Sequence, residues 1–335
     1  MYPEADQIRQ LVEAATSVLI IQPDNPDGDS LGSSLGLEQI MAALGKDTYM
    51  VCGTGLPNYL QYIPGWDRVE TDLPAKFDLS IIVDTSSLSL LENLTKHIGI
   101  AALKSKPCIV LDHHKTESAI DFSTVKLNVP QAAATAEVIY ELCRQLDWEI
   151  PLSGKNALAA AILADSLGLT ADSTTARTVH VIGELVEGGV SLSGLENARR
   201  DMIRKSPDLV HYKGRLLERI EYYDEDRVAI LVIPWPEIEQ YSPLYNPSVL
   251  ALDDMRLTTN TIVAIALKLY PDGKTTAKIR SNYGFPIAAK LAESFGGGGH
   301  DYASGFKLTG YDQTDLDKLK SDIVKRTREM LDEIV

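Results

Sequence analysis

Two adjacent histidines and an aspartate, residues 112–114, directly follow a short apolar run. Residues 109–111 (Ile-Val-Leu) have the β-branched and apolar character of a buried strand, whereas the Asp-His-His sequence does not. A similar run at 80–83 ends in Asp84, and a third at 18–21 leads into a loop with two aspartates. Open α/β sheets bind their ligands at the carboxyl ends of strands. The pattern therefore predicts a polar site at one edge of a sheet.

The two aspartates of this loop, Asp27 and Asp29, are separated only by a glycine, so that one turn can direct both carboxylates to neighbouring points. Asp84 could then bridge two ions. An apolar, helix-like run at 157–163 is followed by another acid, Asp165. We therefore predict five metal ligands: Asp27, Asp29, Asp84, His113 and Asp165. His114 would hydrogen-bond a bound phosphate, and Asp112 would orient a neighbouring imidazole.

This ligand set has a chemical consequence. Hard oxygen ligands with only one or two imidazoles favour Mn²⁺ or Mg²⁺ over zinc, and they leave Co²⁺ and Fe²⁺ as alternatives. Two ions about 3.5–4 Å apart suit hydrolysis of a phosphate ester, because one polarises the phosphoryl oxygen and the pair activates a water. We therefore expect a hydrolase with two divalent cations, Mn²⁺ first among them. No Gly-x-Gly-x-x-Gly turn follows the first strand, which disfavours a dehydrogenase.

The elements that position these residues alternate between strand and helix. Strands are expected at 18–21, at 48–52 and before Asp84 and residue 112, and helices at 32–44, 88–97, 132–146, 156–164 and 175–187. This order predicts an α/β fold whose N-terminal domain has a mainly parallel sheet covered by helices. Two charged helices at 192–205 and 207–222 follow, and then strands at 228–233, 261–269, 275–279 and 303–308 with a helix at 286–294. We expect a domain at 1–190, a helical linker at 191–222 and a smaller C-terminal α+β domain at 223–335.

The bulk properties exclude several classes of protein. With 335 residues the chain is long enough for two domains. Its formal charge of −15 argues against binding of long nucleic acid, which needs a basic stripe. Three scattered cysteines favour a reducing compartment, and neither a signal peptide nor an apolar run of about 18 residues is present. We expect a cytoplasmic protein with no membrane partner, and a homodimer remains open.

A run of four glycines at 296–299 precedes His300. Glycines let backbone N–H groups approach an anion closely, and His300 adds a donor. Arg280 and Ser281, at the end of a strand, add a permanent cation and a hydroxyl. We expect the run to be a loop between a helix and a strand. The predicted substrate-binding residues are Arg280, Ser281, Gly297, Gly298, Gly299 and His300.

In this order, the motifs resemble those of the DHH phosphoesterase family: Asn25-Pro26-Asp27-Gly28-Asp29 with Gly32-Ser33, then Asp84, Asp112-His113-His114 and Asp165. The glycine run with His300 resembles the subgroup with a DHH-associated C-terminal domain, whose nearest members are nanoRNases that also dephosphorylate pAp. The resemblance spans nearly the whole chain. It implies the five metal ligands named above, His114 at the scissile phosphate, and manganese. It also implies that the C-terminal domain holds the terminal nucleotide or phosphate of a short RNA or small nucleotide.

One departure bears on activity, because the family has a metal-ligating histidine where this chain has Pro23. We expect Asp24 or a water to complete the coordination there. The family's aromatic and basic residues after the last acid are also absent around Leu169 and Thr170. The leading interpretation is a phosphoesterase of short oligoribonucleotides or pAp. The alternatives are a phosphodiesterase of linear dinucleotides such as pApA or pGpG, and a nucleotide-binding sensor with weakened catalysis.

Overall fold

The computed structural model describes residues 1–85, 87–98, 100–116, 119–309 and 315–334. The chain divides into two compact units, Met1–Arg204 and Lys205–Val335. Within the segment expected as a helical linker, α8 (Leu192–Met202) belongs to the first unit and α9 (Pro207–Glu218) to the second. Residues 310–314 and 335 of the expected C-terminal domain lie outside the described residues. None of the described helices is long and apolar enough to cross a membrane.

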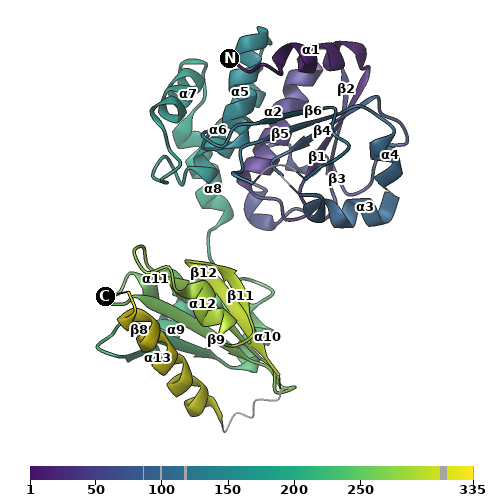
Figure 1. Cartoon of the computed structure of the whole chain (residues 1–335). Coiled ribbons are helices and arrows are strands. Elements are labelled where there is room, and N and C mark those ends of the chain that lie inside the picture. The colour runs from purple at the N-terminus through teal and green to yellow at the C-terminus, as the bar shows by residue number, and fades with distance from the viewer. Residues whose placement is uncertain (86, 99, 117–118, 310–314, 335) are drawn as a thin grey trace. The chain divides into compact units, whose positions relative to one another are not determined.

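The N-terminal unit is built on a six-stranded sheet in which all neighbouring strands are parallel, in the order β3-β2-β1-β4-β5-β6 (Figure 1). The strands are β1 (Ser17–Gln22), β2 (Asp47–Cys52), β3 (Val69–Glu70), β4 (Leu79–Val83), β5 (Cys108–Asp112) and β6 (Val125–Asn128). The sequence analysis missed β3 and β6, which are only two and four residues long. Such short edge strands give too little alternation of apolar and polar residues to be seen.

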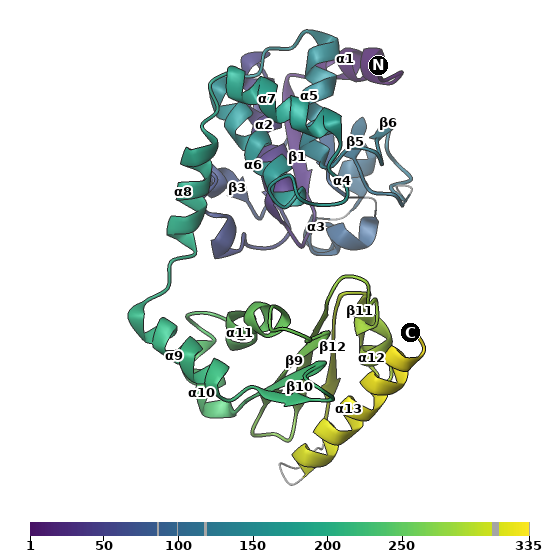
Figure 2. The same cartoon turned by 90° about the vertical axis from the view of Figure 1, so that its left-hand side faces the viewer.

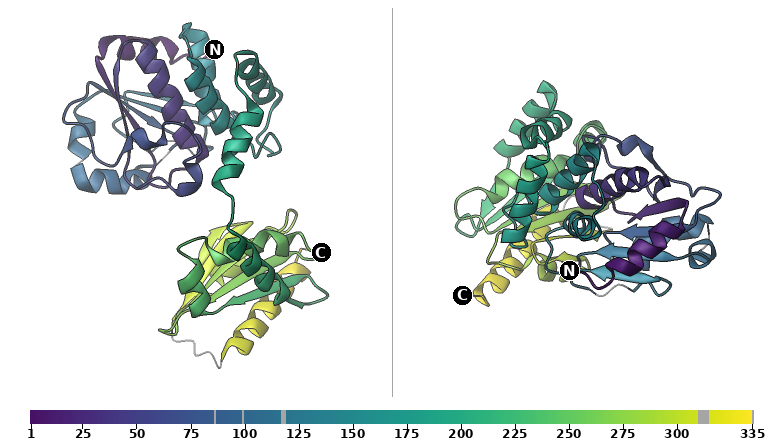
Figure 3. Two further views of the ribbon diagram at one scale, coloured as in Figure 1. Left: turned by 180° about the vertical axis from the view of Figure 1, so that it is seen from behind. Right: turned by 90° about the horizontal axis from the view of Figure 1, so that it is seen from above.

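Helices cover both faces of this sheet, because side chains alternate between the faces along each strand. Val18 and Ile20 of β1 pack with one helix layer, whereas Leu19 and Ile21 pack with the other. The first layer is formed by α1 (Ala5–Ala14), α2 (Gly28–Ala43), α5 (Thr135–Leu146), α6 (Leu152–Asp165) and α7 (Ala176–Glu187). The second contains α3 (Glu92–Ile98) and α4 (Ile100–Lys104), and both layers are seen from behind in Figure 3. The predicted fold class is confirmed.

Helix α2 begins at Gly28, four residues before the helix start expected from the sequence. Asp27 is its N-cap, and its Oδ1 accepts hydrogen bonds from the backbone N–H groups of Asp29 and Ser30, both at 3.0 Å. The expectation that Asp29 lies in a loop is therefore wrong, because Asp29 lies in the first helical turn. Asp, Gly and Ser favour turns in isolation, but together they form an N-cap here.

Helices α2 and α6 pack against each other through glycines spaced four residues apart on α2. A Cβ atom at Gly32 would lie 2.6 Å from the carbonyl oxygen of Ala157 and 2.7 Å from the Cβ of Ala161. Gly28 approaches Ala164 in the same way, so the two helices run antiparallel in close contact. This brings the start of α2 to the end of α6. The loop acids and Asp165 therefore lie at the same edge of the sheet.

The C-terminal unit has a mixed six-stranded sheet in the order β11-β12-β10-β9-β8-β7, in which only β8 and β9 are parallel neighbours. Its strands are β7 (Glu221–Tyr223), β8 (Val228–Ile233), β9 (Val263–Leu269), β10 (Thr275–Ser281), β11 (Gly298–His300) and β12 (Ala303–Leu308). Helices α12 (Ala288–Glu293) and α13 (Leu316–Asp332) cover one face. Helices α9, α10 (Trp235–Tyr241) and α11 (Pro247–Arg256) pack on the other face, over β8 and β9 (Figure 2).

Two expectations for this unit need correction. The helix expected at 207–222 ends at Glu218, and Glu221 already belongs to strand β7. The glycine run is not a loop throughout, because Gly298, Gly299 and His300 form the edge strand β11. The missing side chains explain this pairing, since a Cβ at Gly299 would lie 2.7 Å from the Cα of Ser304 on the neighbouring strand.

Candidate metal centre

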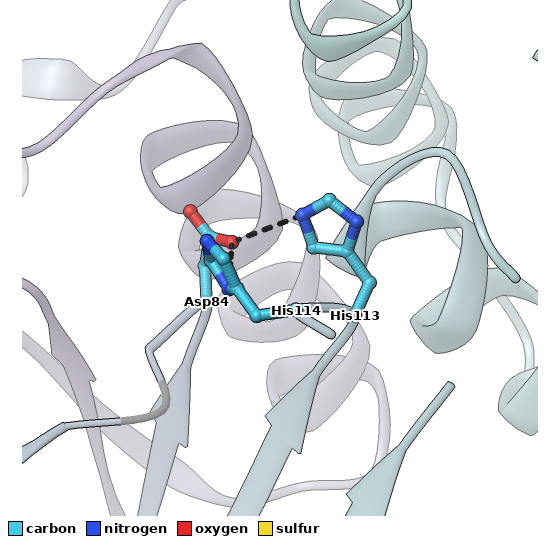
Figure 4. A group of neighbouring side chains, drawn as sticks. All are labelled: Asp84, His113 and His114. Carbon is cyan, nitrogen blue, oxygen red and sulfur yellow. Dashed lines mark ion pairs between the residues drawn. The ribbon is translucent and has the colours of Figure 1, made fainter. Parts of the chain in front are cut away.

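The candidate site lies where two neighbouring parallel strands, β4 and β5, end. Asp84 directly follows β4, Asp112 is the last residue of β5, and Asp84 and the two histidines that follow Asp112 gather at one point (Figure 4). Asp84 has a backbone φ of +56°, a region that residues other than glycine seldom adopt. Its backbone N–H donates to the carbonyl oxygen of Leu111 at 3.0 Å. A strained backbone held by its neighbours is common at functional sites.

His113 is oriented as a metal-ligating imidazole would be. Its Nδ1 lies 3.2 Å from the carbonyl oxygen of Ala132, which can only accept, so Nδ1 carries a hydrogen. Its Nε2 lies 3.3 Å from Oδ2 of Asp165, 3.5 Å from Oδ1 of Asp84 and 3.7 Å from Oδ2 of Asp29. An anchored Nδ1 with Nε2 facing acids is the arrangement by which a second group fixes a ligating histidine.

The electrostatics of this cluster favour a bound cation. Burial raises the pKa of Asp84 well above its ordinary value, and the nearby carboxylate of Asp29 raises it further. Burial likewise raises the pKa of Asp29, and burial followed by the charge of Asp29 raises the pKa of Asp165 to about 6. Burial alone would lower the pKa of His113, but Asp84, Asp29 and Asp165 together raise it to about 10. Crowded acids around one imidazole therefore fit divalent cations, which would replace the bound protons.

Asp29 is fully buried and also caps another helix. Its Oδ2 accepts from the backbone N–H of Thr135 at 2.6 Å, and its Oδ1 accepts from the backbone N–H of Ala136 at 3.1 Å. Both N–H groups belong to the first turn of α5, whose positive end favours negative charge. The hydroxyl of Thr135 donates to Oδ1 of Asp84 at 3.1 Å. The start of α5 therefore holds two of the predicted ligands next to each other.

Asp112 orients an imidazole, as the sequence analysis expected of a residue beside the ligands, and that imidazole is the ring of His114. Oδ1 of Asp112 lies 2.7 Å from Nδ1 of His114 and accepts from the backbone N–H groups of His113 and His114 at 2.9 and 3.3 Å. The side chain of His114 is 46% exposed, so its Nε2 is accessible to a ligand. The pKa of His114 is raised, first by the hydrogen bond to Asp112.

Four of the five predicted ligands come together. Among the described residues, the groups able to hold an ion are Asp84 with His113 and His114, and Asp29 with His113 and Asp165, each with ligand atoms within 4.8 Å of one another. Asp27 lies outside both groups and is exposed. His114 joins a group, although the sequence analysis placed it at the phosphate only.

Asp24, which the sequence analysis offered in place of the family's histidine at position 23, is in neither ion-holding group of the described residues. Its Oδ2 accepts from the backbone N–H of Asn93 at 2.7 Å, and its buried Oδ1 has no hydrogen-bond partner among the described residues. Gln22, which directly precedes Pro23, is fully buried, and its side-chain amide has no hydrogen-bond partner within the described chain. The sequence analysis gave Gln22 no role, although a polar residue that ends an apolar strand was a visible signal.

A pocket of about 710 Å³ lies beside this cluster within the N-terminal unit, and Asp27 and Asp165 are part of its wall. The remaining wall is largely apolar and aromatic, and it includes Tyr59, Tyr62, residues of α6 and α8, and Arg199 paired with Glu196. Pockets of this size hold small organic ligands. The sequence analysis missed this pocket because the residues that line it come from distant segments.

The predicted substrate-binding residues of the C-terminal unit fall on two faces of its sheet. Arg280 lies directly opposite Ala303, which lies directly opposite His300, so all three are on one face. Ser281 is on the other face, is 2% exposed, and donates its hydroxyl hydrogen to the carbonyl oxygen of Asp301 at 3.1 Å. The backbone N–H of Gly297 donates to the carbonyl oxygen of Ala292 at the end of α12. Gly298 and Gly299 lie at the exposed sheet edge.

Comparison with known proteins identifies related chains. Residues 17–165 match the DHH family, N-terminal domain. The chain is 25% identical over 307 residues to the bifunctional oligoribonuclease and PAP phosphatase NrnA of Thermus thermophilus, covering 92% of this chain and 88% of that protein. It is 23% identical over 339 residues to the cyclic-di-AMP phosphodiesterase GdpP of Bacillus subtilis, covering 94% of this chain and 49% of that protein.

A solved structure shares the fold. An exopolyphosphatase-related protein from Bacteroides fragilis has a TM-score of 0.81 at 20% identity, covering 98% of this chain and 97% of that one. The names of the two sequence relatives both describe enzymes that cleave phosphoesters of nucleotides.

Proposed function

We propose that the chain is a phosphoesterase of the DHH family and that it hydrolyses short oligoribonucleotides and small nucleotides such as pAp with two divalent cations. The observation that carries this proposal is the orientation of His113, whose Nε2 faces the carboxylates of Asp29, Asp84 and Asp165 while its Nδ1 is anchored on a backbone carbonyl. A bound pair of Mn²⁺ ions would supply polarisation of the phosphoryl group and activation of a water.

The proposed ligands are the five residues predicted from the sequence: Asp27, Asp29, Asp84, His113 and Asp165. Asp84 would bridge both ions, because it is shared between the two histidines and lies close to Asp29. Asp27 is the outermost member, and its charge contributes to the raised pKa of Asp84 after burial and Asp29. Pro23 has no ligating side chain and Asp24 is in neither ion-holding group of the described residues, so a water would take the position of the family's histidine.

The other residues of the site would bind and orient the substrate. Nε2 of His114 would donate to a phosphate oxygen, with its ring held by Asp112. The pocket lined by Tyr59 and Tyr62 would take a nucleoside, since aromatic rings stack on any base. Arg280 and His300 of the C-terminal unit would hold a further phosphate. A net charge of −15 agrees with short substrates, which need only a few placed cations.

Two alternatives to this function each rest on a specific observation. Similarity to a cyclic-di-AMP phosphodiesterase supports linear dinucleotides such as pApA as substrates. The proline at position 23 supports a sensor that binds nucleotides with little turnover.

The test is incubation of the full chain with Mn²⁺ and a labelled RNA dinucleotide, pAp or pApA, with products separated by chromatography. We expect release of mononucleotides, and its absence together with tight nucleotide binding would support the sensor instead. His300→Ala should raise KM for the dinucleotide while leaving Mn²⁺ binding intact, because His300 lies outside the proposed ligand set. A defect confined to metal uptake would contradict this placement of His300.

A further inference from the structure

A single peptide group connects a buried carboxylate to the imidazole of His113. The carbonyl oxygen of Ala132 accepts from Nδ1 of His113 at 3.2 Å. The N–H of the same peptide group belongs to Ala133 and donates to Oε2 of Glu137 at 3.1 Å. Ala133 and Glu137 are only 1% and 4% exposed, so bulk water does not compete for this hydrogen bond. The carboxylate of Glu137 is therefore two hydrogen bonds away from a proposed metal ligand.

The carboxylate of Glu137 is held in place by a second helix. The hydroxyl of Thr178, a fully buried residue of α7, donates to the same Oε2 at 2.9 Å. Within the described part of the chain, no lysine or arginine forms an ion pair with Glu137, since Arg177 of α7 pairs with Glu141 and Glu184 instead. A buried carboxylate without a cation depends on the hydrogen-bond donors around it. These donors are the peptide N–H and the hydroxyl.

Glu137 also has a structural role, which a neutral side chain could perform. It is the third residue of α5, and its side chain reaches back to a backbone N–H that precedes the helix, as the Glu or Gln of a capping box does. The N-cap residue itself, Ala134, makes no side-chain hydrogen bond. A glutamine could accept the same N–H, and burying an amide costs less than burying a charge. Capping alone therefore does not explain why the buried side chain is charged.

The charge matters at the other end of the peptide group. A hydrogen bond to an ionised acceptor is about twice as strong as one between neutral groups, and hydrogen bonds in a chain polarise one another. The carboxylate on the N–H of Ala133 therefore makes the carbonyl oxygen of Ala132 a stronger acceptor for Nδ1–H of His113. A histidine that donates from one ring nitrogen to a strong acceptor is fixed in orientation and is a better metal ligand at the other nitrogen.

We propose that Glu137 is a positioning residue of the metal centre, whose charge acts through the peptide group between Ala132 and Ala133 to orient His113 and to strengthen cation binding at Nε2. This inference rests on the proposed function, because it concerns a ligand of the proposed centre. Partners that hold a ligating histidine typically change metal affinity about 10- to 100-fold. Because a peptide group lies between the carboxylate and the ring, we expect an effect near the lower end, about tenfold.

The binding test measures the affinity of the full chain for Mn²⁺ by calorimetry. Glu137→Gln keeps an acceptor for the N–H and the hydroxyl and removes the charge, so the dissociation constant should rise about tenfold while the midpoint of urea unfolding stays nearly unchanged. The matched control is Glu141→Gln, which removes a half-buried carboxylate one turn further along α5 and should keep the wild-type dissociation constant. Equal Mn²⁺ affinities of the wild type and Glu137→Gln would overturn the inference.

Nuclear magnetic resonance observes the hydrogen bond of His113 without a metal ion. In the metal-free, ¹⁵N-labelled full chain, the proton on Nδ1 of His113 should exchange slowly and resonate downfield, and it is assigned by its loss in His113→Gln. Glu137→Gln should move this signal upfield, because the carbonyl becomes a weaker acceptor, and Glu141→Gln should leave it in place. A wild-type chain without this protected proton would also overturn the inference, whichever variants fold.

The two measurements together separate this inference from the proposed function. If Glu137→Gln moves the ring proton but the wild-type chain binds no Mn²⁺, the proposed metal centre fails and the orienting role of Glu137 stands. If the wild-type chain binds Mn²⁺ and hydrolyses a dinucleotide but Glu137→Gln changes neither the ring proton nor the dissociation constant, the inference fails and the hydrolase stands.

Discussion

Binding of a divalent cation at the proposed centre is expected to expel one proton from His113, which makes metal affinity depend steeply on pH. Nε2 of this imidazole lies 3.3 to 3.7 Å from the nearest oxygens of Asp165, Asp84 and Asp29. Burial opposes protonation of the ring, but these carboxylates raise the pKa of His113 to about 10. A cation that takes Nε2 must replace a proton that is held there at neutral pH.

The size of this effect follows from the pKa. At a pH of about 7.5, an imidazole with the ordinary pKa of about 6.5 is protonated in roughly one molecule in ten. His113, with a pKa of about 10, is protonated in nearly every molecule. Removing that proton costs about 3.4 kcal/mol at this pH, since each pKa unit corresponds to about 1.36 kcal/mol. The dissociation constant for Mn²⁺ should therefore fall about tenfold for each unit of pH between about 7 and 9.

Calorimetric titration of the metal-free chain with Mn²⁺ under nitrogen measures both quantities. Repeating it in two buffers with different ionisation enthalpies gives the number of protons released, which we expect to be close to one for the first cation. The control is His180→Gln, which removes an exposed histidine of α7 and should change neither value. A dissociation constant that stays flat over this range, with no proton release, would refute Nε2 of His113 as a ligand.

Three substitutions test other parts of the structure. Asp84→Asn should abolish Mn²⁺-dependent hydrolysis with an unchanged circular dichroism spectrum, and substantial residual turnover would exclude Asp84 as the bridging ligand. Asp165→Asn should stabilise the metal-free chain above pH 6 by up to about 3 kcal/mol in urea unfolding. The substitution should stabilise because the folded-state pKa of Asp165 is raised from 3.8 to about 6, so the charged carboxylate destabilises the fold increasingly as pH rises through this range. An Asp165→Asn variant with no gain in stability at pH 8 would contradict this reasoning. Gly32→Ala should lower the melting temperature, because its Cβ would meet Ala157 and Ala161. The control is Gly214→Ala, at a helical glycine with open space around it, which should raise stability by about 0.5–1 kcal/mol. Equal shifts in both variants would refute the close-packing argument.

The metal centre could be predicted from the sequence to the extent that strand ends define it. Runs ending at Asp84 and Asp112 read as strands, and carboxyl ends of parallel neighbours meet at one edge. The pattern predicts that His113 lies near Asp29, Asp84 and Asp165, and the structure brings these four residues together. The sequence does not reveal how closely α2 and α6 approach each other, because this depends on contacts between glycines of α2 and residues of α6 that are more than 100 positions away.

The C-terminal surface was predicted less well, because side-chain direction there depends on register. Arg280 and Ser281 are adjacent in sequence and were assigned to one site, yet a strand directs them to opposite faces. The glycine run formed an edge strand because β12 offered it a partner, which composition alone does not reveal.

Asp29 shows how closely the fold and the proposed centre depend on each other. Its carboxylate accepts hydrogen bonds from two backbone N–H groups at the start of α5 and from the hydroxyl of Ser33. Asp29→Ala would therefore remove a helix cap that contributes about 1 kcal/mol of stability. It would also leave buried donors without a partner, at a cost of about 1–3 kcal/mol. Loss of turnover in that variant would therefore not separate metal binding from stability. The carboxylate of Asp84 accepts from the hydroxyl of Thr135 and, among the described residues, from no backbone N–H, which makes it the better position for testing the centre. Because Thr135 contacts both acids, the first turn of α5 sets their separation, and the same dipole that stabilises two neighbouring carboxylates keeps them close enough to share a cation.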